Sequence, residues 1–428
     1  MAQQRITAST FDFNSTLLKT VCILFVFCVA TAIASSAQFF STVYSFQGPP
    51  GGANPEAGLV HASDGNFYGT TFGGGNQNTN FCLSTNGCGV VFKVTPSGTA
   101  TVLYSFCSQH NCSDGANPQS GLVQASDGNF YGTTEIGGTG TGCFYGTCGT
   151  VFKITPQGTL TTLYSFCSQS NCVDGANPDA TLVQANNGDL YGTTFDGGTS
   201  SCGGVGCGTV FKITLSGALT TLHSFDSYDG YWPYAGLVQA TDGYLYGTAL
   251  NGGTDGLSGL GTIFKMTPDG TLTTLYSFCS QPNCSDGSTP YAGLVSASDG
   301  NLYGATYGGG ANGDGTVFKI SQGGTFTSLH SFAGSSDGFF PYAALVQASD
   351  GNFYGTTFEG GAHNGGTIYK ITPSGAVTTL YNFGEGALPT SSLVQVGGPN
   401  LYGTTFGGDG TVFRVTIPRA CTQCPNVE

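Results

Sequence analysis

Seven copies of one segment account for most of this chain, and they limit its fold more than any other feature. The clearest copy, residues 351–383, reads GNFYGTTFEGGAHNGGTIYKITPSGAVTTLYNF and predicts three β-strands, NFYGTT, GTIYKIT and AVTTLYNF. The ALVQA segment just before it (344–348) predicts a fourth. The Tyr-Gly pair of the segment recurs at Tyr68, Tyr131, Tyr191, Tyr246, Tyr303, Tyr354 and Tyr402. The chain is therefore expected to form seven units of four short antiparallel strands.

The chain neither begins with the first strand of a repeat nor ends with the fourth. A fourth-strand sequence, STVYSF (41–46), precedes any first strand, and the last third-strand sequence, GTVFRVT (410–416), has no fourth strand after it. The N-terminal strand can complete the last unit, which closes a ring and removes an open sheet edge. We therefore expect an all-β fold: a seven-bladed β-propeller of four-stranded antiparallel blades, closed by the N-terminal strand joining the last blade.

Glycines in the repeat predict two local geometries. Asp64-Gly65 and its equivalents follow the first strand, and Asp-Gly pairs are typical of hairpin turns in which both residues have positive φ. The glycine after each repeat tyrosine is expected to let an aromatic ring of a neighbouring blade approach the backbone.

The first 37 residues differ from the repeats. Arg5 and Lys19 precede an apolar run from residue 21 to 34, which small residues follow up to Ala37. This order is typical of a secretory signal peptide cut after Ala37, with an uncleaved N-terminal anchor as the alternative. The expected divisions are a leader (1–37), the propeller (38–417) and a C-terminal tail (418–428).

The charge of the mature chain limits its partners. Removing Arg5, Lys19 and Asp12 with the leader reduces 10 basic and 24 acidic side chains to 8 and 23, a net charge near −15. Such a surface repels nucleic acid and anionic membranes. We expect a secreted or cell-surface monomer with no membrane span after leader cleavage, and an extracellular glycan or protein as its partner.

The cysteines agree with export. Two of the 16 leave with the leader, and the other 14 form close pairs: Cys82 with Cys88, Cys107 with Cys112, Cys143 with Cys148, Cys167 with Cys172, Cys202 with Cys207, Cys279 with Cys284, and Cys421 with Cys424. Even, local pairing in an exported chain predicts disulfides that staple loops. A four-sulfur zinc site made of two pairs is the alternative. Loose spacing, the lack of accompanying histidines and the placement of most pairs in different repeats weigh against zinc.

The pattern LVQASDGNFYGTT, then GG, then GTVFKITPSGTLTTLYSF resembles the GloVer tandem repeat of exported bacterial proteins. The resemblance covers residues 42–416, and many of its positions recur in all seven copies. It implies an exported repeat protein and carries no catalytic residue across. Some members of that family have C-terminal surface anchors. This chain ends in IPRACTQCPNVE, without a hydrophobic tail, so anchoring by that route is not expected.

Alternation of strands assigns the loops to two faces. The turns between strands one and two, and three and four, are short and form a short-turn face. The other connections are longer, more variable and carry twelve of the fourteen mature cysteines, and they form a long-loop face. Variable loops on a rigid scaffold usually carry binding sites, so we expect function on the long-loop face.

Five fourth-to-first loops share the motif Asp-Gly-x-x-Pro. Their acids are Asp114, Asp174, Asp229, Asp286 and Asp337. Carboxylates arranged around one face could bind Ca²⁺, the one cofactor that the sequence suggests. The alternative is that each Asp caps its own turn.

The same loops carry aromatic side chains in three consecutive units. The candidate ligand-binding residues are Tyr231, Trp232, Tyr234, Tyr291, Phe339, Phe340 and Tyr342. Flat apolar rings beside carboxylates and amides suit sugars, whose hydroxyls form hydrogen bonds at the rim. The alternative is packing between blades.

Two further sets of polar residues recur in the repeat. One is cationic: Lys93, Lys153, Lys212, Lys265, Lys319, Lys370 and Arg414. We expect each cation to pair with a turn carboxylate on the short-turn face, rather than to form a ring for an anion. The other set lies on the innermost strand, where we expect hydrogen bonds between blades rather than a ring of ligand-binding groups: His61, Gln124, Gln184, Gln239, Ser296, Gln347 and Gln395.

Sequence motifs for catalysis are missing from the chain. There is no HExxH, GxSxG or Walker loop, and the five histidines have no repeat position common to all of them; His223 and His330 merely replace the Tyr before Ser-Phe. The predicted function is a secreted, non-enzymatic binding module that recognises glycan or protein through the long-loop face. One alternative is a propeller hydrolase or lyase acting on polysaccharide, with acids such as Glu135, Asp196 and Glu359. The other alternative is a structural component of the cell envelope.

Overall fold

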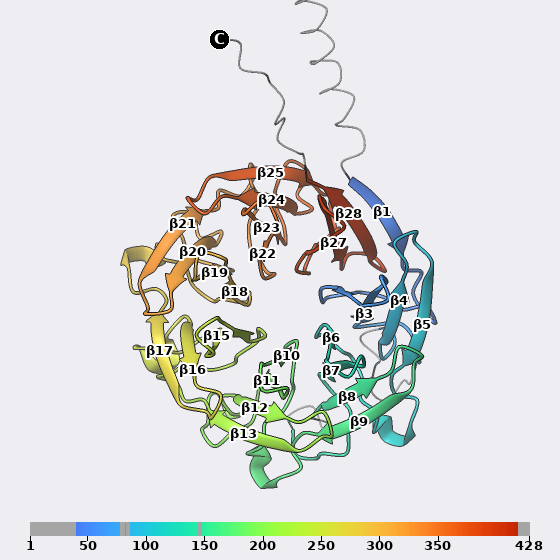
Figure 1. Ribbon diagram of the computed structural model, residues 1–428. Helices are drawn as coiled ribbons and strands as arrows, with labels where there is room; N and C mark the ends of the chain where they lie inside the picture. The colour runs from blue at the N-terminus through green and yellow to red at the C-terminus, as the bar shows by residue number, and fades with distance from the viewer. Residues whose placement is uncertain (1–39, 78–81, 83–85, 144–147, 418–428) are drawn as a thin grey trace, which may run out of the picture.

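Seven four-stranded antiparallel sheets surround one axis in the computed structural model (Figure 1). The structure describes residues 40–77, 82, 86–143 and 148–417. The predicted leader (1–37) and the tail (418–428) lie outside the described residues. The tail includes Cys421 and Cys424, so the disulfide predicted between them stays a prediction. No helix among the described residues is long and apolar enough to span a membrane.

Each blade has the same strand order from the axis outward. The innermost strands are β2 (Val60–His61), β6 (Val123–Gln124), β10 (Val183–Gln184), β14 (Val238–Gln239), β18 (Val295–Ser296), β22 (Val346–Gln347) and β26 (Val394–Val396). The second strands are β3 (Phe67–Thr71), β7 (Phe130–Thr134), β11 (Leu190–Thr194), β15 (Leu245–Ala249), β19 (Asn301–Thr306), β23 (Phe353–Thr357) and β27 (Asn400–Thr405). The innermost strands are shorter than the predicted five residues, since only two or three residues of each pair with the second strand.

The outer half of each blade completes the sheet. The third strands are β4 (Val90–Val94), β8 (Thr150–Ile154), β12 (Thr209–Ile213), β16 (Thr262–Met266), β20 (Thr316–Ser321), β24 (Thr367–Ile371) and β28 (Thr411–Thr416). The outermost strands are β5 (Ala100–Ser105), β9 (Leu160–Ser165), β13 (Leu219–Ser224), β17 (Leu272–Ser277), β21 (Phe326–Ser331), β25 (Val377–Asn382) and β1 (Phe40–Ser45). Single 3₁₀ turns lie in the long loops: η2 (His110–Cys112), η3 (Ser170–Cys172), η4 (Gly256–Ser258) and η5 (Pro282–Cys284).

The N-terminal strand completes the last blade, as predicted. β1 pairs antiparallel with β28, with Ser41 opposite Arg414 and Ser45 opposite Thr411. In Figure 1, β1 (blue) lies beside β28 (red). The amide of Phe46 continues the ladder by donating to Gly410 O at 3.0 Å. The predicted seven-bladed closure is confirmed.

The blades pack on one another through aromatic rings. The phenylalanine after each outermost strand meets the third-strand ring of the next blade edge-on, with centroids 5.0–5.3 Å apart and planes at 63–74°. The pairs are Phe46/Phe92, Phe106/Phe152, Phe166/Phe211, Phe225/Phe264, Phe278/Phe318, Phe332/Tyr369 and Phe383/Phe413. Edge-to-face pairs stabilise beyond the area they bury. The ring is thus held together by one contact repeated seven times.

Two local predictions were wrong in detail. The glycine after each repeat tyrosine faces the ring of its own blade: a Cβ on Gly69 would lie 2.8 Å from Phe92 Cζ, because the two residues are cross-strand partners. In the Asp64-Gly65 turn only the glycine has positive φ, at 80°. The Asp64 side chain instead accepts a hydrogen bond from the Asn66 amide at 3.0 Å, so the hairpin is a type I turn followed by a left-handed glycine.

Candidate functional site: a cavity on the propeller axis

An unusual backbone conformation recurs in all seven fourth-to-first loops. The residue before the loop proline lies in the left-handed region, with φ between 48° and 60°. These residues are Asn54, Asn117, Asn177, Trp232, Thr289, Phe340 and Leu388. We call these positions the pre-proline slots. The proline that follows restricts the backbone, and the residue after it lines the axis.

The seven residues after these prolines line one cavity of about 320 Å³, at the long-loop end of the innermost strands. They are Glu56, Gln119, Asp179, Tyr234, Tyr291, Tyr342 and Thr390. Every blade contributes one of them. Sequence reasoning identified the three tyrosines and missed the other four. The signal for all seven was available, because this position varies between blades while its neighbours are uniform.

Asparagine fills the pre-proline slot in the first three blades. Asn tolerates the left-handed conformation better than other non-glycine residues. Its side chain also joins neighbouring blades: Asn117 Nδ2 donates to Phe72 O at 2.8 Å, and Asn177 Nδ2 donates to Glu135 O at 3.0 Å. In these blades the slot has a clear structural role.

Aromatic residues fill the same slot in two later blades. Trp232 stacks on Phe195 of the preceding blade, with centroids 5.3 Å apart and planes at 15°. Phe340 stacks on Tyr307 in the same way, at 4.4 Å and 11°. A bulky side chain in the left-handed region is strained, at a cost of about 1–3 kcal/mol. The two stacks widen the aromatic surface beside the cavity.

The three axial tyrosines form one wall of the cavity. Tyr291 stacks on Tyr342 at 5.1 Å and meets Tyr234 edge-on at 5.3 Å. The Tyr342 hydroxyl donates to Tyr234 Oη at 2.8 Å, and the Tyr234 hydroxyl donates to Gln119 Oε1 at 2.7 Å. Burial raises the pKa of Tyr234 and Tyr342 well above the ordinary tyrosine value. Both hydroxyls therefore stay protonated and act as donors at neutral pH.

Carboxyl groups form the opposite wall. Burial raises the pKa of Glu56 to about 8, with Glu135 adding repulsion. Asp179 has a strongly raised pKa, caused first by burial and then by the charges of Glu135, Asp196 and Glu56. Burial and Glu135 raise the pKa of Asp196 to about 7. As whole residues, Glu56 and Asp179 are only partly buried because they border the cavity, but protein surrounds their carboxyl groups closely enough to raise their pKa. Glu135 and Asp196 do not line this cavity, and Asp196 lines the second cavity described below.

The structure brings five of the seven predicted aromatic residues together at or beside the cavity: Trp232, Tyr234, Tyr291, Phe340 and Tyr342. The other two support them from behind. Tyr231 is 8% exposed, packs edge-on against Trp232 at 5.0 Å and donates to Leu257 O at 3.1 Å. Phe339 packs edge-on against Phe340 at 4.8 Å.

The five predicted calcium ligands do not converge, because each serves its own loop. Asp114 accepts hydrogen bonds from the Tyr104 hydroxyl at 2.8 Å and from the amides of Ser108 and Gln109 at 2.9 and 3.2 Å. Asp174 and Asp286 repeat this arrangement. Asp229 and Asp337 pair instead with His223 and His330, at 2.7 and 2.8 Å. Calcium binding at these acids stays a prediction, and it would have to displace these partners.

The profile of the family described as the Gloeobacter/Verrucomicrobia repeat matches residues 28–206, 79–283 and 256–423. The chain belongs to this family. The family description names no ligand or activity, so the geometry of the cavity carries the functional argument for this Gloeobacter/Verrucomicrobia repeat protein.

Solved structures resemble the repeat protein in fold. One is the extracellular domain of a protein assigned as a hybrid two-component system of B. thetaiotaomicron, with a TM-score of 0.54 and 10% identity, covering 90% of this chain. The repeat protein spans 40% of that chain. A second, assigned as a 6-phosphogluconolactonase of Bacteroides uniformis, has a TM-score of 0.48 and 18% identity over 74% of this chain and 84% of its own. Among curated proteins, none matches in sequence.

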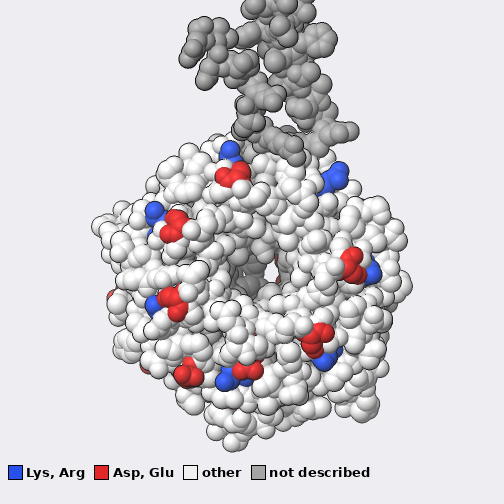
Figure 2. Space-filling model, viewed as in Figure 1, with Lys and Arg blue, Asp and Glu red and all other residues white. Residues whose placement is uncertain are grey.

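The short-turn face of the repeat protein carries ion pairs and no predicted ligand residue. Figure 2 shows basic and acidic side chains side by side around this face, with a hollow at the axis. Four lysines pair with turn aspartates as predicted: Lys93/Asp64 at 3.3 Å, Lys153/Asp127 at 3.2 Å, Lys212/Asp189 at 3.9 Å and Lys265/Asp242 at 2.9 Å. Partial burial works to raise the pKa of Asp64, but hydrogen bonds from Asn66, Tyr68 and Lys93 outweigh it and lower the pKa to about 2.

The glutamines of the innermost strand join neighbouring blades, as predicted. Gln124 Oε1 accepts from the Ser63 amide at 2.9 Å, and Gln184 Oε1 accepts from the Ser126 amide at 2.8 Å. The same bond recurs at Asn186/Gln239, Ser298/Gln347 and Ser349/Gln395. The glutamines therefore have a structural role in the ring.

Six of the seven predicted disulfides are present: Cys82–Cys88, Cys107–Cys112, Cys143–Cys148, Cys167–Cys172, Cys202–Cys207 and Cys279–Cys284. The seventh predicted bond joins Cys421 to Cys424, and both residues lie beyond Ile417, the last residue that the structure describes. The bond between Cys421 and Cys424 is therefore neither confirmed nor contradicted.

One argument against zinc was wrong. Cys143–Cys148 and Cys167–Cys172 belong to the same blade, and their four Sγ atoms lie within 4.8 Å of one another. Even so, Cys202–Cys207 and Cys279–Cys284 form without a second pair nearby in the described residues. A cysteine pair of this spacing can therefore form a disulfide without a second pair beside it that would complete a four-sulfur zinc site.

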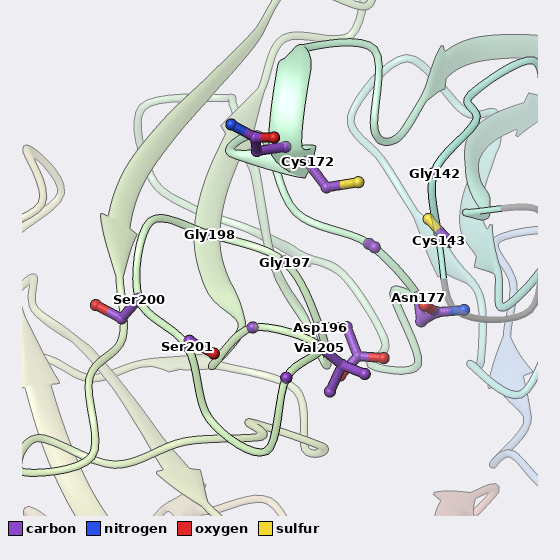
Figure 3. A pocket seen from close by; sticks show the side chains of 14 residues that line it. Gly142, Cys143, Cys172, Asn177, Asp196, Gly197, Gly198, Ser200, Ser201 and Val205 are labelled. Atoms are coloured by element: carbon purple, nitrogen blue, oxygen red, sulfur yellow. The ribbon is translucent and has the colours of Figure 1, made fainter.

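A second cavity, of about 310 Å³, is lined by residues of the loops around Cys143, Cys172 and Asp196. Figure 3 shows Cys143, Asn177 and Asp196 at its edge, with glycines and serines of the 196–206 loop around them. It has no aromatic wall and draws on two blades only. The axial cavity is therefore the better candidate for a ligand site.

Proposed function

We propose that this repeat protein is an extracellular binding module that holds a glycan in the axial cavity. The observation that carries the proposal is the pre-proline slot. Asparagine meets the structural needs of this position in three blades, yet Trp232 and Phe340 occupy it at a cost in backbone strain. Strain that the fold does not need is often found at functional sites.

The chemistry of the two walls suits a sugar ring. Tyr234, Tyr291 and Tyr342 line the cavity and offer flat apolar surface for the C–H face of a ring. The Trp232/Phe195 and Phe340/Tyr307 stacks adjoin this wall, because Phe195 meets Tyr234 and Tyr307 meets Tyr342 edge-on. Glu56, Gln119 and Asp179 offer donors and acceptors for its hydroxyls. Binding pockets commonly combine apolar walls with a few polar groups. The cavity volume of about 320 Å³ lies at the lower end of the range of ligand pockets and suits one or two sugar units.

A location outside the cell agrees with the same features. The six disulfides suit an oxidising compartment. The basic and apolar start of the chain fits a secretory leader.

A glycan array probed with the secreted protein tests the proposal. The informative variant is Trp232→Asn. Asparagine occupies the pre-proline slot in the first three blades, so this change should preserve the fold. We expect binding by the native protein and a loss of at least ~10-fold in Trp232→Asn. Tyr244→Ala is the matched control, since Tyr244 is a partly exposed aromatic residue on the short-turn face, with Lys265 Nζ 3.8 Å from its ring centroid. Equal binding by Trp232→Asn, or none by the native protein, would refute the proposal.

The carboxyl wall favours a second candidate, a hydrolase or lyase acting on polysaccharide. Glycosidases use one protonated and one ionised carboxyl group, and the raised pKa of Glu56, about 8, keeps a proton available at neutral pH. Release of reducing ends from a bound polysaccharide, lost in Glu56→Gln, would establish this activity. Binding without product release would leave the binding module as the function.

A further inference from the structure

Four sulfur atoms from two loops of the second blade meet beside the second cavity. Cys143 and Cys148 lie in the loop between β7 and β8, and Cys167 and Cys172 lie in the loop that follows β9. Each loop closes its own disulfide. All four Sγ atoms nevertheless lie within 4.8 Å of one another. The two disulfides are therefore direct neighbours in space.

This spacing is close to that of a four-thiolate metal site. Zn²⁺ is bound by four Cys sulfurs at about 2.3 Å in a tetrahedron, which places the sulfurs about 3.8 Å from one another. Sulfurs of different loops already lie close to this separation. Sulfurs of the same loop reach it by rotation of their side chains once the S–S bond is broken. Thiolates are soft ligands, which suit Zn²⁺ better than Ca²⁺ or Mg²⁺.

The second cavity gives access to the cluster. Cys143 and Cys172 line this cavity, and Figure 3 shows their sulfur atoms directed toward one another at its edge. Both residues are partly exposed, whereas Cys148 and Cys167 are buried. One sulfur of each disulfide is thus within reach of a small molecule or an ion that enters the cavity.

A second loop of nearly the same sequence provides an internal comparison. The loop after β9 reads FCSQSNCVDG, and the loop after β17 reads FCSQPNCSDG. Cys279 and Cys284 of the latter have φ of 59° and 51°, and Cys167 and Cys172 have φ of 56° and 51°. Cys279 and Cys284 have no second cysteine pair within 4.8 Å in the described residues. The cluster therefore arises from the meeting of two loops and not from the sequence of one.

A related group lies in the first blade. The Sγ atoms of Cys82, Cys88 and Cys107 also lie within 4.8 Å of one another. Three sulfurs leave one position of a tetrahedral ion open. The cluster of the second blade is therefore the more complete metal site.

We propose that Cys143, Cys148, Cys167 and Cys172 bind one Zn²⁺ through their thiolates when the protein is reduced. The disulfides each close a single loop, whereas the metal ion joins both loops to each other. An oxidising compartment favours the disulfides, so the zinc form belongs to the reduced chain. This site is independent of the proposed function, because it is tested without any carbohydrate.

Reduction comes before metal binding, and the reductant that it requires is a dithiol. A thiolate of the dithiol attacks one sulfur of each S–S bond, and a second thiolate of the same molecule completes the exchange. Each protein disulfide gains two electrons and two protons, and each dithiol leaves as a disulfide. The four protein thiols then form four Zn–S bonds and release four protons. Formation of the disulfides again would break these bonds and release the ion.

Measurement of bound zinc in the secreted protein tests the site. The protein is reduced with dithiothreitol, separated from it without oxygen and dialysed against ZnCl₂, and bound zinc is measured by mass spectrometry. We expect Cys167→Ser/Cys172→Ser to bind one Zn²⁺ fewer per chain than the native protein, and Cys143→Ser/Cys148→Ser to show the same loss. Cys279→Ser/Cys284→Ser is the matched control and should bind as much zinc as the native protein. The oxidised native protein should bind less zinc than the reduced one.

Four outcomes would overturn the proposal. They are no bound zinc in the reduced native protein, native zinc content in both variants of the cluster, the same loss of zinc in Cys279→Ser/Cys284→Ser, and equal binding by the oxidised and reduced native proteins. Circular dichroism of each reduced variant checks the fold. Because the two halves of the cluster are changed separately, a folding defect in one variant is not mistaken for a lost ligand set.

Discussion

The hydroxyl of Tyr342 donates a hydrogen bond to Tyr234 Oη, 2.8 Å away, although the residues are 108 positions apart and belong to blades separated by a third. Tyr234 in turn donates to Gln119 Oε1 at 2.7 Å, a further 115 positions away in sequence. This chain of hydroxyl and amide groups joins three blades across the axis. It fixes the tyrosine wall relative to the carboxyl wall, so the cavity has a defined shape before any ligand arrives.

Removing the central hydroxyl should therefore destabilise the ring. Tyr234→Phe leaves the Tyr342 hydroxyl and Gln119 Oε1 without their shared partner, and an unsatisfied buried group costs about 1–3 kcal/mol. Chemical denaturation of the native and variant proteins measures this loss. Tyr291→Phe is the control, because the Tyr291 hydroxyl has no hydrogen bond within the described residues. Equal losses in the two variants would show that the chain of bonds is unimportant.

The N-terminal strand should be essential for closure. A protein that begins at residue 47 lacks β1 and the Phe46 ring that packs on Phe92 at 5.0 Å. We expect a loss of ~3 kcal/mol or more, together with self-association through the exposed edge of β28. Size-exclusion chromatography with light scattering and calorimetry would detect both effects. A protein lacking only residues 1–37 is the control, and identical behaviour of the two truncations would contradict the closure.

The repeated aromatic contact between blades should dominate local stability. Phe106 is fully buried and meets Phe152 edge-on at 5.1 Å. Phe106→Ala is expected to cost about 3–5 kcal/mol, and Phe106→Leu less. Thr161→Ala, an exposed change on β9 of the next blade, should stay within ~0.5 kcal/mol. Unfolding in urea would compare the three, and a small effect of Phe106→Ala would argue against this packing.

Low pH should favour the folded protein through the buried carboxyl groups near the axis. Because burial raises the pKa of folded Glu56 from 4.5 to about 8, the folded state holds this proton more tightly than the unfolded chain. The resulting stability is fully present below pH 4.5 and is lost as pH rises to about 8, at ~1.4 kcal/mol per unit of pKa difference. The pKa of Asp196 is raised from 3.8 to about 7, so its contribution to stability is likewise lost as pH rises between these two values.

Thermal unfolding from pH 4.5 to 8.5 checks the direction of this pH dependence. We expect the unfolding temperature to fall across the range in the native protein and to fall less in Glu56→Gln. The turn aspartates cannot produce this trend. Their pKa is lowered, to about 2 for Asp64, so their contribution is lost only as pH falls towards 2. A flat profile, or the same slope in the variant, would contradict the assignment.

The fold could be predicted because the same strand and turn sequences recur seven times. The sequence of β1 matches a fourth strand that the last blade lacks, so the ring can close in only one way. The glycine contact was misassigned because the register of β3 against β4, which puts Gly69 opposite Phe92, is not visible in the sequence. At the site, Trp232 and Tyr234 stood out as departures from the repeat. Glu56 and Asp179 did not: their position after the loop proline varies between blades, but only the structure shows that the side chain at this position lines the axis.

A crystal structure of the protein with the glycan that binds best on the array tests the central claim most directly. A sugar ring packed against Tyr291 and Tyr342, with its hydroxyls directed to Asp179 and Gln119, is the predicted result. A glycan seated on another surface, with the axial cavity free of sugar, would contradict it.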